Sequence, residues 1–352
     1  GVAPATPDSE TAALVGETPR VQIDTPRLTG SISLLGGRID ELWLKDYRVT
    51  LQPDSDIVEL FYPVGQDGAY YALFGWAPGG DLQFEDVPGD NTVWESVGAE
   101  TLTPETPITL TWDNRQGLVF KRTISVDENY MFSVTQTVEN NSGSSVRLAP
   151  NIELVRHGLP ADLTNFYILH EGAITQSGEE LSEYKYKKIA DFGSTEKWGP
   201  ASEVTDVAGN GWLGFTDHYW MSTIIPAADQ SFESVVQYDA RTDKFRAIAR
   251  LSTIDVADGA SAATTTQLFA GAKEWETIRN YQNEDGIYKF IDTIDWGWFF
   301  FLTKPIFFVL HWLHGFIGNM GWSIIALTLI IKAILFPLAY KSYVSMARMK
   351  EL

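Results

Sequence analysis

The sequence predicts a mainly β protein: a large antiparallel β-sandwich followed by helices, one of which crosses a membrane. Apolar and polar side chains alternate with a two-residue period through residues 27–271, and turn-forming glycine, proline and asparagine clusters interrupt them repeatedly. From about Lys273 the apolar residues recur at helical spacing instead. The apolar run from Gly321 to Ala339 is long enough to span a bilayer, because about 20 helical residues cover the roughly 30 Å hydrocarbon core.

Composition and charge restrict the classes of partner. The length of 352 residues leaves room for one large domain or two ordinary ones, and a hydrophobic content of 44% is enough to build a core. There are 26 lysines and arginines and 46 aspartates and glutamates, so the formal net charge is −20. This charge argues against nucleic acid or anionic lipid as the main partner of the soluble part. Because the sequence has no cysteine, it excludes disulfides and cysteine-ligated zinc, and we expect no metal or other cofactor.

Residues 1–26 are expected to form a flexible tether. The opening sequence is GVAPATPDSETAALVGETPR, which is rich in proline, threonine, alanine and acidic residues and shows no apolar periodicity. Such a segment buries too little apolar surface to offset the entropy of ordering it. The folded domain is therefore expected to start at Arg27.

Residues 27–272 are predicted to form the antiparallel sandwich. Alternating apolar and polar side chains are typical of half-buried strands. The clearest runs are Ile108, Leu110 and Trp112, then Phe132, Val134 and Val138, then Phe245, Ala247, Ala249 and Leu251. Many short strands joined by frequent turns indicate a sandwich, and because no fixed-period repeat is visible we set propellers and solenoids aside.

Residues 273–295 are expected to form an amphipathic helical connector. Trp275, Ile278 and Tyr281 recur at helical spacing, so they share one face of a short helix. That face can pack against the sandwich, or the helix can lead down to the membrane.

Residues 296–320 are predicted to form a helix that lies flat in the outer membrane interface. The segment is apolar enough to span, but Lys304-Pro305 divides it. Three tryptophans, Trp296, Trp298 and Trp312, give it interfacial character and are the expected anchors. Two histidines three residues apart, His311 and His314, lack an evident third ligand, so we expect polar-face residues rather than a metal site.

Residues 321–340 are predicted to be a transmembrane helix that carries an unusual cation. Lys332 lies eleven positions after Gly321, and an ammonium near the bilayer centre costs roughly 2.5–3.5 kcal/mol on insertion scales. One interpretation is that its stem snorkels to the headgroups. The interpretation that we favour places it in a wet, protein-lined cavity, with Thr328 one turn earlier on the same face. Pro337 is expected either to kink the helix or to be tolerated near its end.

The flanking charges predict the orientation of this helix. The side chains that follow it include Lys341, Arg348 and Lys350, whereas those that precede it include Glu284, Asp285, Asp292 and Asp295. By the positive-inside rule, residues 341–352 begin a cytoplasmic basic helix and the sandwich lies outside. This orientation implies an anchor or signal segment upstream of the sequence, and the unfinished basic pattern implies that the natural protein continues.

Long motifs resemble the YidC/Oxa/Alb family of membrane protein insertases. The longest is GWFFFLTKPIFFVLHWLHGFIGNMGWSIIALTLIIKAILFPLAYKSYVSMARMK, which looks like the entry into the conserved core of this family. Three upstream motifs look like the large periplasmic domain of Gram-negative members: LTGSISLLGGRIDELWLKDY, YKYKKI and GWLGFTDHYWMSTIIP. The resemblance therefore covers nearly everything after the tether.

The resemblance implies a β-supersandwich of the galactose-mutarotase type, an interfacial helix and the first of five core membrane helices, after which this chain ends. In the family, the five helices enclose a hydrophilic groove in which a conserved positive residue, usually arginine, attracts the polar part of an incoming segment. The matching residue is Lys332, which keeps the charge but loses the planar guanidinium fork. The implied role is an insertase or chaperone of the bacterial inner membrane with its large domain in the periplasm.

The partners that the resemblance implies are nascent membrane proteins, the lipid bilayer, SecYEG and SecDF, and the ribosome through cytoplasmic parts that this chain lacks. For the sandwich itself, a docking surface is the first expectation, a cleft for an extended peptide the second and a sugar site the third.

The competing function class is a membrane-anchored sugar-binding or aldose-epimerase-like protein. The candidate acids, bases and stacking residues are His157, His170, His218, Glu153, Glu171, Trp212, Tyr219 and Trp220. An acid–base pair requires two side chains that converge in one cleft. None of these histidines lies in a motif that matches an epimerase, so we do not expect an enzyme.

Overall fold

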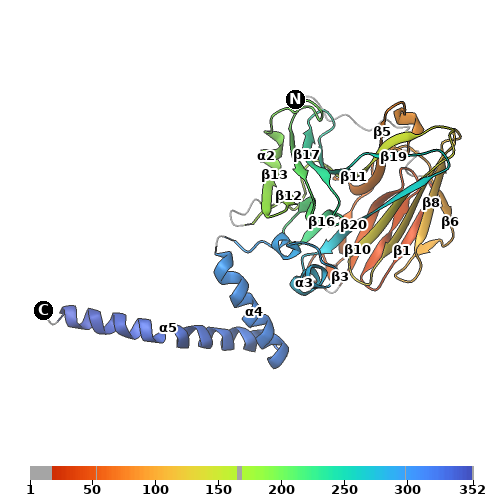
Figure 1. Cartoon of the computed structure of the whole chain (residues 1–352). Helices are drawn as coiled ribbons and strands as arrows, with labels where there is room; N and C mark the ends of the chain where they lie inside the picture. The colour runs from red at the N-terminus through yellow and green to blue at the C-terminus, as the bar shows by residue number, and fades with distance from the viewer. Residues whose placement is uncertain (1–17, 53, 165–168, 298, 351–352) are drawn as a thin grey trace. The chain divides into compact units, whose positions relative to one another are not determined.

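The computed structural model describes residues 18–52, 54–164, 169–297 and 299–350, with the backbone alone at 347–350. The chain divides after Ile294 into two compact units. The described part of the first unit is mainly β, and that of the second is helical (Figure 1).

Two β-sheets form the first unit. The strands of one sheet are β1 (Arg20–Asp24), β2 (Leu28–Ser33), β3 (Arg38–Arg48), β4 (Ile57–Phe61), β5 (Tyr70–Gly79), β7 (Thr101–Leu102), β11 (Val146–His157), β14 (Ser202–Val207), β17 (Phe232–Asp239), β18 (Lys244–Leu251) and β19 (Ile254–Val256). The strands of the other are β6 (Glu95–Val97), β8 (Ile108–Asp113), β9 (Leu118–Val126), β10 (Met131–Asn140), β12 (Gly172–Ser177), β13 (Glu180–Lys185), β15 (Gly211–Thr216), β16 (Trp220–Pro226) and β20 (Ser261–Ala272).

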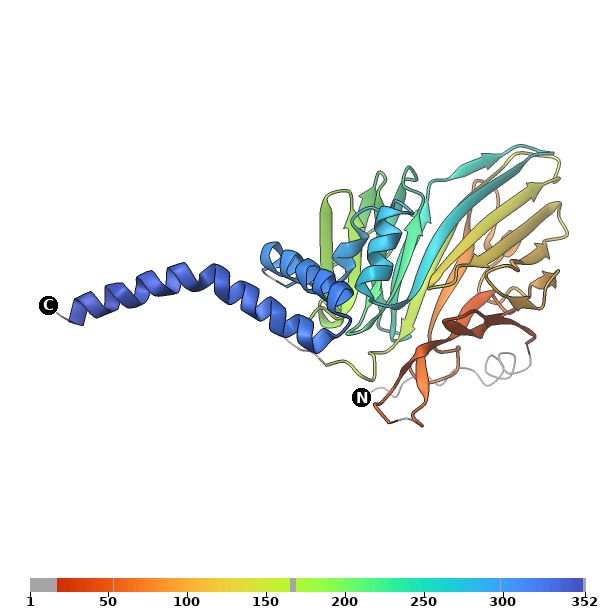
Figure 2. The same ribbon diagram turned by 90° about the horizontal axis from the view of Figure 1, so that it is seen from below.

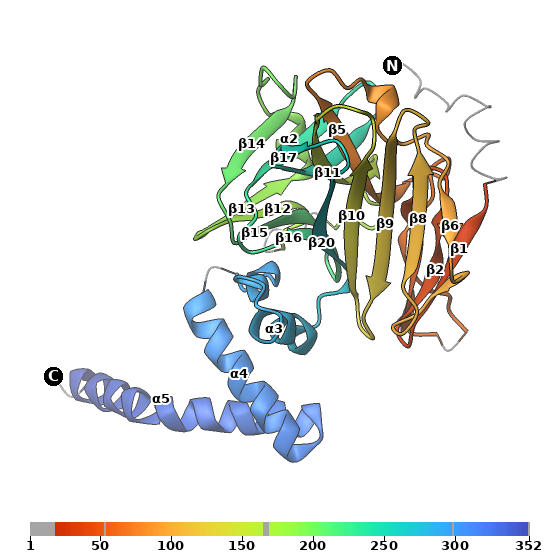
Figure 3. The same ribbon diagram turned by 45° about the vertical axis from the view of Figure 1, so that its right-hand side comes forward.

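The sheets are antiparallel, as the sequence predicts. Within the described chain, the first runs in the order β14-β17-β18-β11-β5-β3-β2-β1-β7, with β4 beside β3 and β19 beside β11. The second runs β13-β12-β15-β16-β20-β10-β9-β8-β6, and Figure 3 shows β10, β9 and β8 side by side. The exception among the described pairs is β1, which pairs in parallel with β7 on its outer side.

The helical elements are short in the first unit and long in the second. They are η1 (Phe84–Asp86), α2 (Tyr186–Ala190), α3 (Trp275–Asn283), η2 (Phe290–Thr293), α4 (Phe300–Ile317) and α5 (Met320–Lys350). A mainly β fold with C-terminal helices is thus confirmed. Figure 2 shows the same elements from below.

One apolar core takes side chains from both sheets. Its largest members include Phe74 of the first sheet and Phe120 and Phe132 of the second, all of them fully buried. The predicted alternation is confirmed where it was clearest, because Ile108 and Leu110 on β8 are fully buried while Thr109 and Thr111, which alternate with them, are partly exposed.

Two buried arginines show how this core accommodates charge. Arg156 on β11 donates to Asp217 at 2.6 Å and lies 4.0 Å from the ring centre of Tyr70. Arg122 on β9 has no carboxylate beside it among the described residues; it donates to main-chain carbonyls, including that of Gly37 at 2.6 Å. Burial lowers the pKa of Arg122 to about 9. Gly37 has a left-handed φ of 61°, which favours glycine, and a Cβ there would also press against Nη1 of Arg122.

The predicted tether is wrong at its C-terminal end. Residues 20–24 form β1, which pairs with β2 through the register Arg20↔Ser33 to Asp24↔Thr29. Val21 and Ile23 are buried in the core. The apolar alternation in this five-residue strand is too short to stand out beside proline-rich and threonine-rich neighbours. Residues 1–17 of the predicted tether lie outside the described residues.

Candidate functional site

The helix α5 is continuous from Met320 to Lys350 and carries apolar side chains on all sides. It follows Gly318, whose left-handed φ of 72° ends α4. The side-chain oxygen of Asn319 accepts a hydrogen bond from the backbone N–H of Trp322 at 3.2 Å. Exposed apolar side chains of α5 include Ile324, Ile325, Leu329, Ile334, Leu335, Phe336 and Leu338. A helix that is apolar all round is suited to lipid rather than to water.

Lys332 and Thr328 lie one helical turn apart on α5, and both are exposed. The Thr328 hydroxyl donates to the Ile324 carbonyl at 2.8 Å, so its own helix satisfies it. In the described part of the chain, no ion pair or hydrogen bond engages the Lys332 ammonium. The two residues predicted to line the groove thus lie close together on α5. The groove itself stays a prediction.

Pro337 lies inside α5, and the helix continues beyond it to Lys350. The predicted boundary at residue 340 is therefore not a break in the helix. By length and composition alone, both α4 and α5 are able to cross a membrane.

The two long helices diverge from the turn at Gly318 and Asn319 (Figures 1 and 3). They contact each other, and among their described side chains those that are buried are Leu313 of α4 and Ser323 of α5. Two spans in an antiparallel hairpin would run side by side along their lengths. The flat orientation of α4 in the interface stays a prediction.

The predicted tryptophan anchors are partly described. Trp296 folds back onto the first turns of α4, where its ring centre is 5.6 Å from that of Phe307 and its carbonyl accepts from the Thr303 hydroxyl at 2.9 Å. Trp312 is 61% exposed and stacks on Phe316. Trp298 lies outside the described residues. Their anchoring role stays a prediction.

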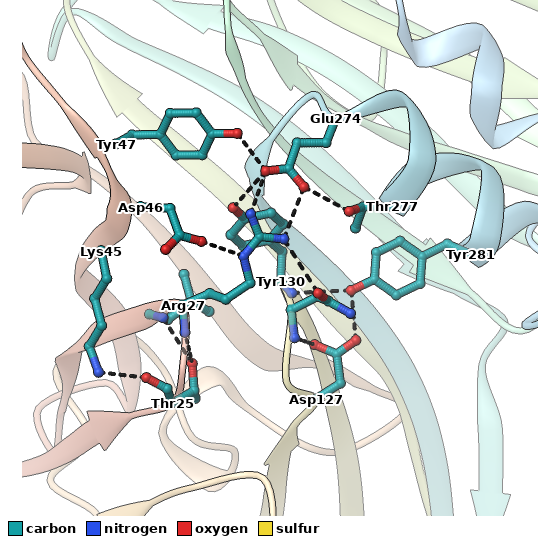
Figure 4. Close-up of polar contacts among 12 residues, drawn as sticks. Thr25, Arg27, Lys45, Asp46, Tyr47, Asp127, Tyr130, Glu274, Thr277 and Tyr281 are labelled. Atoms are coloured by element: carbon teal, nitrogen blue, oxygen red, sulfur yellow. Dashed lines mark hydrogen bonds and ion pairs between the residues drawn. The ribbon is translucent and has the colours of Figure 1, made fainter. Parts of the chain in front are cut away.

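The connector helix α3 is fastened to the sandwich by a cluster that the sequence analysis missed (Figure 4). Arg27 donates to both carboxylate oxygens of Glu274, which immediately precedes α3, and to Asp46 at 2.6 Å. The hydroxyls of Tyr47 and Tyr130 also donate to Glu274. We call these five residues the Glu274 cluster.

Electrostatics inside the Glu274 cluster favour the ionised carboxylate. Burial alone would raise the pKa of Glu274, but hydrogen bonds from Arg27, Tyr47 and Thr277 lower it to about 2. A neighbouring contact supports the same helix, because the Tyr281 hydroxyl donates to Asp127 at 2.6 Å. No local pattern could have revealed the cluster, since Arg27 and Glu274 are 247 residues apart.

The candidate histidines of the epimerase hypothesis lie in separate local environments. His157 on β11 is half-buried, and burial followed by the charge of Lys244 lowers its pKa to about 4. His170 is buried, with Nε2 2.9 Å from the Ala173 carbonyl. His218 stacks on Tyr219 with ring centres 3.9 Å apart. The hollows described within the folded residues are not lined by any of these three histidines.

The other candidates for a sugar site are engaged elsewhere. Glu153 accepts from Asn151 at 2.7 Å, and Glu171 accepts from the Thr164 hydroxyl at 2.9 Å. Trp212 is buried and donates to the Tyr288 carbonyl. Trp220 packs edge-on against Tyr47. The described residues include no cluster of three or more histidines or carboxylates able to hold a metal. The expectations of no enzyme activity and no cofactor stay predictions.

Two family models together match nearly the whole chain. The YidC periplasmic domain matches residues 20–309, and the 60Kd inner membrane protein family matches residues 312–352. Among curated relatives, a membrane protein insertase YidC of Cereibacter sphaeroides is 57% identical over 100% of this chain and 59% of its own length. One of Ruegeria pomeroyi is 58% identical over 96% of this chain and 56% of its own.

Solved structures with a similar β unit are much more distant. A galactose mutarotase-like protein from Lactobacillus casei shares 11% identity at a TM-score of 0.45, over 72% of this chain and 100% of its own. A galactose mutarotase related enzyme from Lactobacillus acidophilus shares 11% at 0.44, over 72% and 97%. At this level of similarity nothing about activity follows from the likeness.

Proposed function

The chain belongs to the YidC family, and we propose that it forms part of a membrane protein insertase and chaperone that helps nascent membrane proteins enter and fold in the bilayer, alone or with the Sec translocon. The chain spans less than three fifths of the length of the curated relatives cited above. The activity of the whole protein, its substrates and its partners are therefore part of this proposal.

The observation that carries the proposal is Lys332 in the middle of an apolar helix. Its ammonium is exposed and has no ion-pair partner within the described residues. In lipid such a cation is unfavourable, which restricts it to positions where water or an anionic group reaches it. We place Lys332 in the wall of a wet groove, which keeps it protonated and lets it attract a carboxylate.

The proposed action needs no covalent chemistry. The cation draws the polar or acidic flank of an incoming segment partway across the membrane. This shortens the apolar distance that the flank still has to cross, and the apolar segment then moves sideways into lipid because it is more stable there than in water. Thr328, whose hydroxyl is bonded to its own helix, adds polar surface to the same face.

The proposed topology follows from the charges and the bend. Lys341 on the C-terminal part of α5 is placed on the cytoplasmic side, so the β unit lies in the periplasm. The helix α4 lies flat in the periplasmic interface, with Trp296 and Trp312 as anchors. The β unit then serves first as a docking surface, with SecDF and SecYEG as the proposed partners, while the ribosome acts on the cytoplasmic side.

The test compares Lys332→Ala and Lys332→Glu with Lys341→Ala as the matched control on the same helix. The substrate is a membrane protein whose translocated tail carries acidic residues, and the measurement is the rate at which the tail becomes protected on the far side. We expect at least about a tenfold loss with Lys332→Glu, a smaller loss with Lys332→Ala, and little change in the control. Normal rates with both Lys332 variants would contradict the groove role.

A further inference from the structure

A hollow of about 450 Å³ opens at one end of the first sheet. It crosses the ends of five neighbouring strands, β5, β11, β18, β17 and β14. Figure 3 labels β5, β11, β17 and β14 among them. Its volume falls in the range of sites that hold a small ligand or a few residues of a peptide. Nothing in the groove proposal uses this part of the molecule.

Arg250 of β18 lines the hollow and is held in a fixed orientation. Its Nε donates to the side-chain oxygen of Asn151, the residue opposite it on β11, at 2.8 Å. One face of its guanidinium lies over the Trp198 ring, with the central carbon 4.6 Å from the ring centre. Trp198 is in turn positioned by Gln237, whose amide donates to its carbonyl at 2.5 Å.

The end of the Arg250 guanidinium is not engaged by the protein. In the described part of the chain, no hydrogen bond reaches its two terminal nitrogens, and no carboxylate lies within ion-pair distance. Burial, opposed in part by the charges of Glu153 and Glu233, lowers the pKa of Arg250, yet a guanidinium stays protonated. The result is a half-buried, oriented fork with two free donors.

The surrounding charges favour a single negative charge as the ligand. Lys197, the other cation of the hollow, is paired with Glu233 at 2.5 Å. Asp206 is exposed, so solvent screens its charge. One unneutralised cation suits a monoanion better than a phosphate dianion, and a planar fork matches the geometry of a carboxylate.

The lining also favours a peptide over a sugar. Sugar rings are usually held against the open face of an aromatic side chain. Here the Trp198 face is occupied by Arg250, and the aromatic lining residue described is Phe232, which is buried. Pro78 and the exposed hydroxyl groups of Ser231 and Ser252, which are 2.8 Å apart and hydrogen-bonded to each other, offer the mixed surface that a short peptide backbone contacts.

We propose that this hollow binds the carboxylate of a peptide segment through the two free donors of Arg250. The carboxylate belongs either to an acidic side chain or to a chain terminus, and both sources present the same group. The site is independent of the Lys332 groove, so it can persist or fail without affecting that proposal.

The experiment uses the whole chain in detergent, labelled with 5-fluorotryptophan and followed by fluorine NMR. The Trp198 resonance is assigned with Trp198→Phe. The probes are a blocked tripeptide with a central glutamate, its glutamine counterpart, and the glutamine peptide with a free C-terminal carboxylate. We expect a saturable shift of the Trp198 resonance with one or both acidic peptides and binding at least about tenfold weaker with the blocked glutamine peptide.

Variants of Arg250 test whether its guanidinium group is responsible for the binding of the acidic peptides. Arg250→Gln is expected to weaken binding at least about tenfold, and Arg250→Lys, which keeps the charge but not the fork, to weaken it less. Arg241→Gln is the matched control, because that side chain is 91% exposed on the turn before β18, and it should leave binding unchanged. Unchanged resonances of the other tryptophans verify that each variant is folded.

Three outcomes would overturn the proposal. One is the absence of a saturable Trp198 shift with every peptide at millimolar concentration. Another is equal binding of the acidic peptide to Arg250→Gln and to the parent protein. The third is a shift with glucuronate or inorganic phosphate but with no peptide, which would assign the hollow to another ligand class.

Discussion

The two units of this protein differ in whether their unusual charged side chains are bonded within the fold. In the β unit, Arg156 and Asp217 are both buried and bonded to each other, and Arg122 is surrounded by main-chain carbonyls. On α5, Lys332 stands among exposed apolar side chains, with no ion-pair partner in the described residues. A charge that is satisfied within its own fold indicates a structural role, whereas one left open indicates that its partner comes from outside the fold.

The largest expected effect is a loss of folding stability when the buried pair of Arg156 and Asp217 is broken. Asp217→Ala leaves Arg156 buried without its carboxylate, and removing one partner of such a pair costs about 3–5 kcal/mol. Urea unfolding of the chain in mild detergent, followed by circular dichroism of the β unit, measures the free energy of unfolding. Asp255→Ala is the control, because its pair with Arg147 is on the surface and should contribute almost nothing. Equal stability of the two variants would remove the distinction.

The second prediction tests whether Lys332 differs from Arg156 as described. Lys332→Leu removes a cation that has no internal partner, so the protein should unfold at the same temperature or higher in detergent. Insertion of a substrate with an acidic tail should nevertheless fall by about as much as with Lys332→Ala, because both variants remove the proposed attracting charge. A marked loss of thermal stability would show that Lys332 has a structural partner after all.

The third prediction concerns the Glu274 cluster, which is half-buried. Its exposure lies between that of the buried pair of Arg156 and Asp217 and that of the exposed Lys332. The pKa of Glu274 is lowered to about 2, from an ordinary value of 4.5, so its stabilising effect is present above pH 4.5 and is lost as the pH falls toward 2. Glu274→Gln should lower the free energy of unfolding at pH 7 by about 1–2 kcal/mol, allowing for solvent screening. The same variant should show a flatter loss of stability between pH 5 and about pH 2 than the parent protein.

The smallest effect is expected at Thr328. Because its hydroxyl is bonded to the Ile324 carbonyl, Thr328→Val removes little that a substrate can use. We expect less than about a twofold change in insertion rate, set against the large change at Lys332 one turn away. A loss as large as that of Lys332→Glu would mean that the hydroxyl contacts the substrate directly.

Local patterns predicted the elements of this protein well. Strand alternation around Ile108 and Leu110 and the helical spacing of Ile278 and Tyr281 are short-range signals, and the structure buries all four side chains. The apolar character of α5 and the position of Lys332 are likewise visible in a single stretch of sequence.

Contacts between distant residues could not be predicted in the same way. The pairing of Arg27 with Glu274 and of Arg156 with Asp217 depends on the order of strands, which alternation does not specify. The strand β1 was missed because it is stabilised by its neighbours β2 and β7 rather than by its own composition. The free fork of Arg250 is visible only once Asn151 and Trp198 are placed beside it.

The position of β20 in its sheet sets an order of events during synthesis. This strand, Ser261–Ala272, lies between β16 and β10, so it joins the two halves of the second sheet although it is the last strand to leave the ribosome. The sheet therefore stays in two pieces until β20 emerges, just before the apolar helices do. The second sheet, and with it the complete sandwich, can close only after residue 272 has been made.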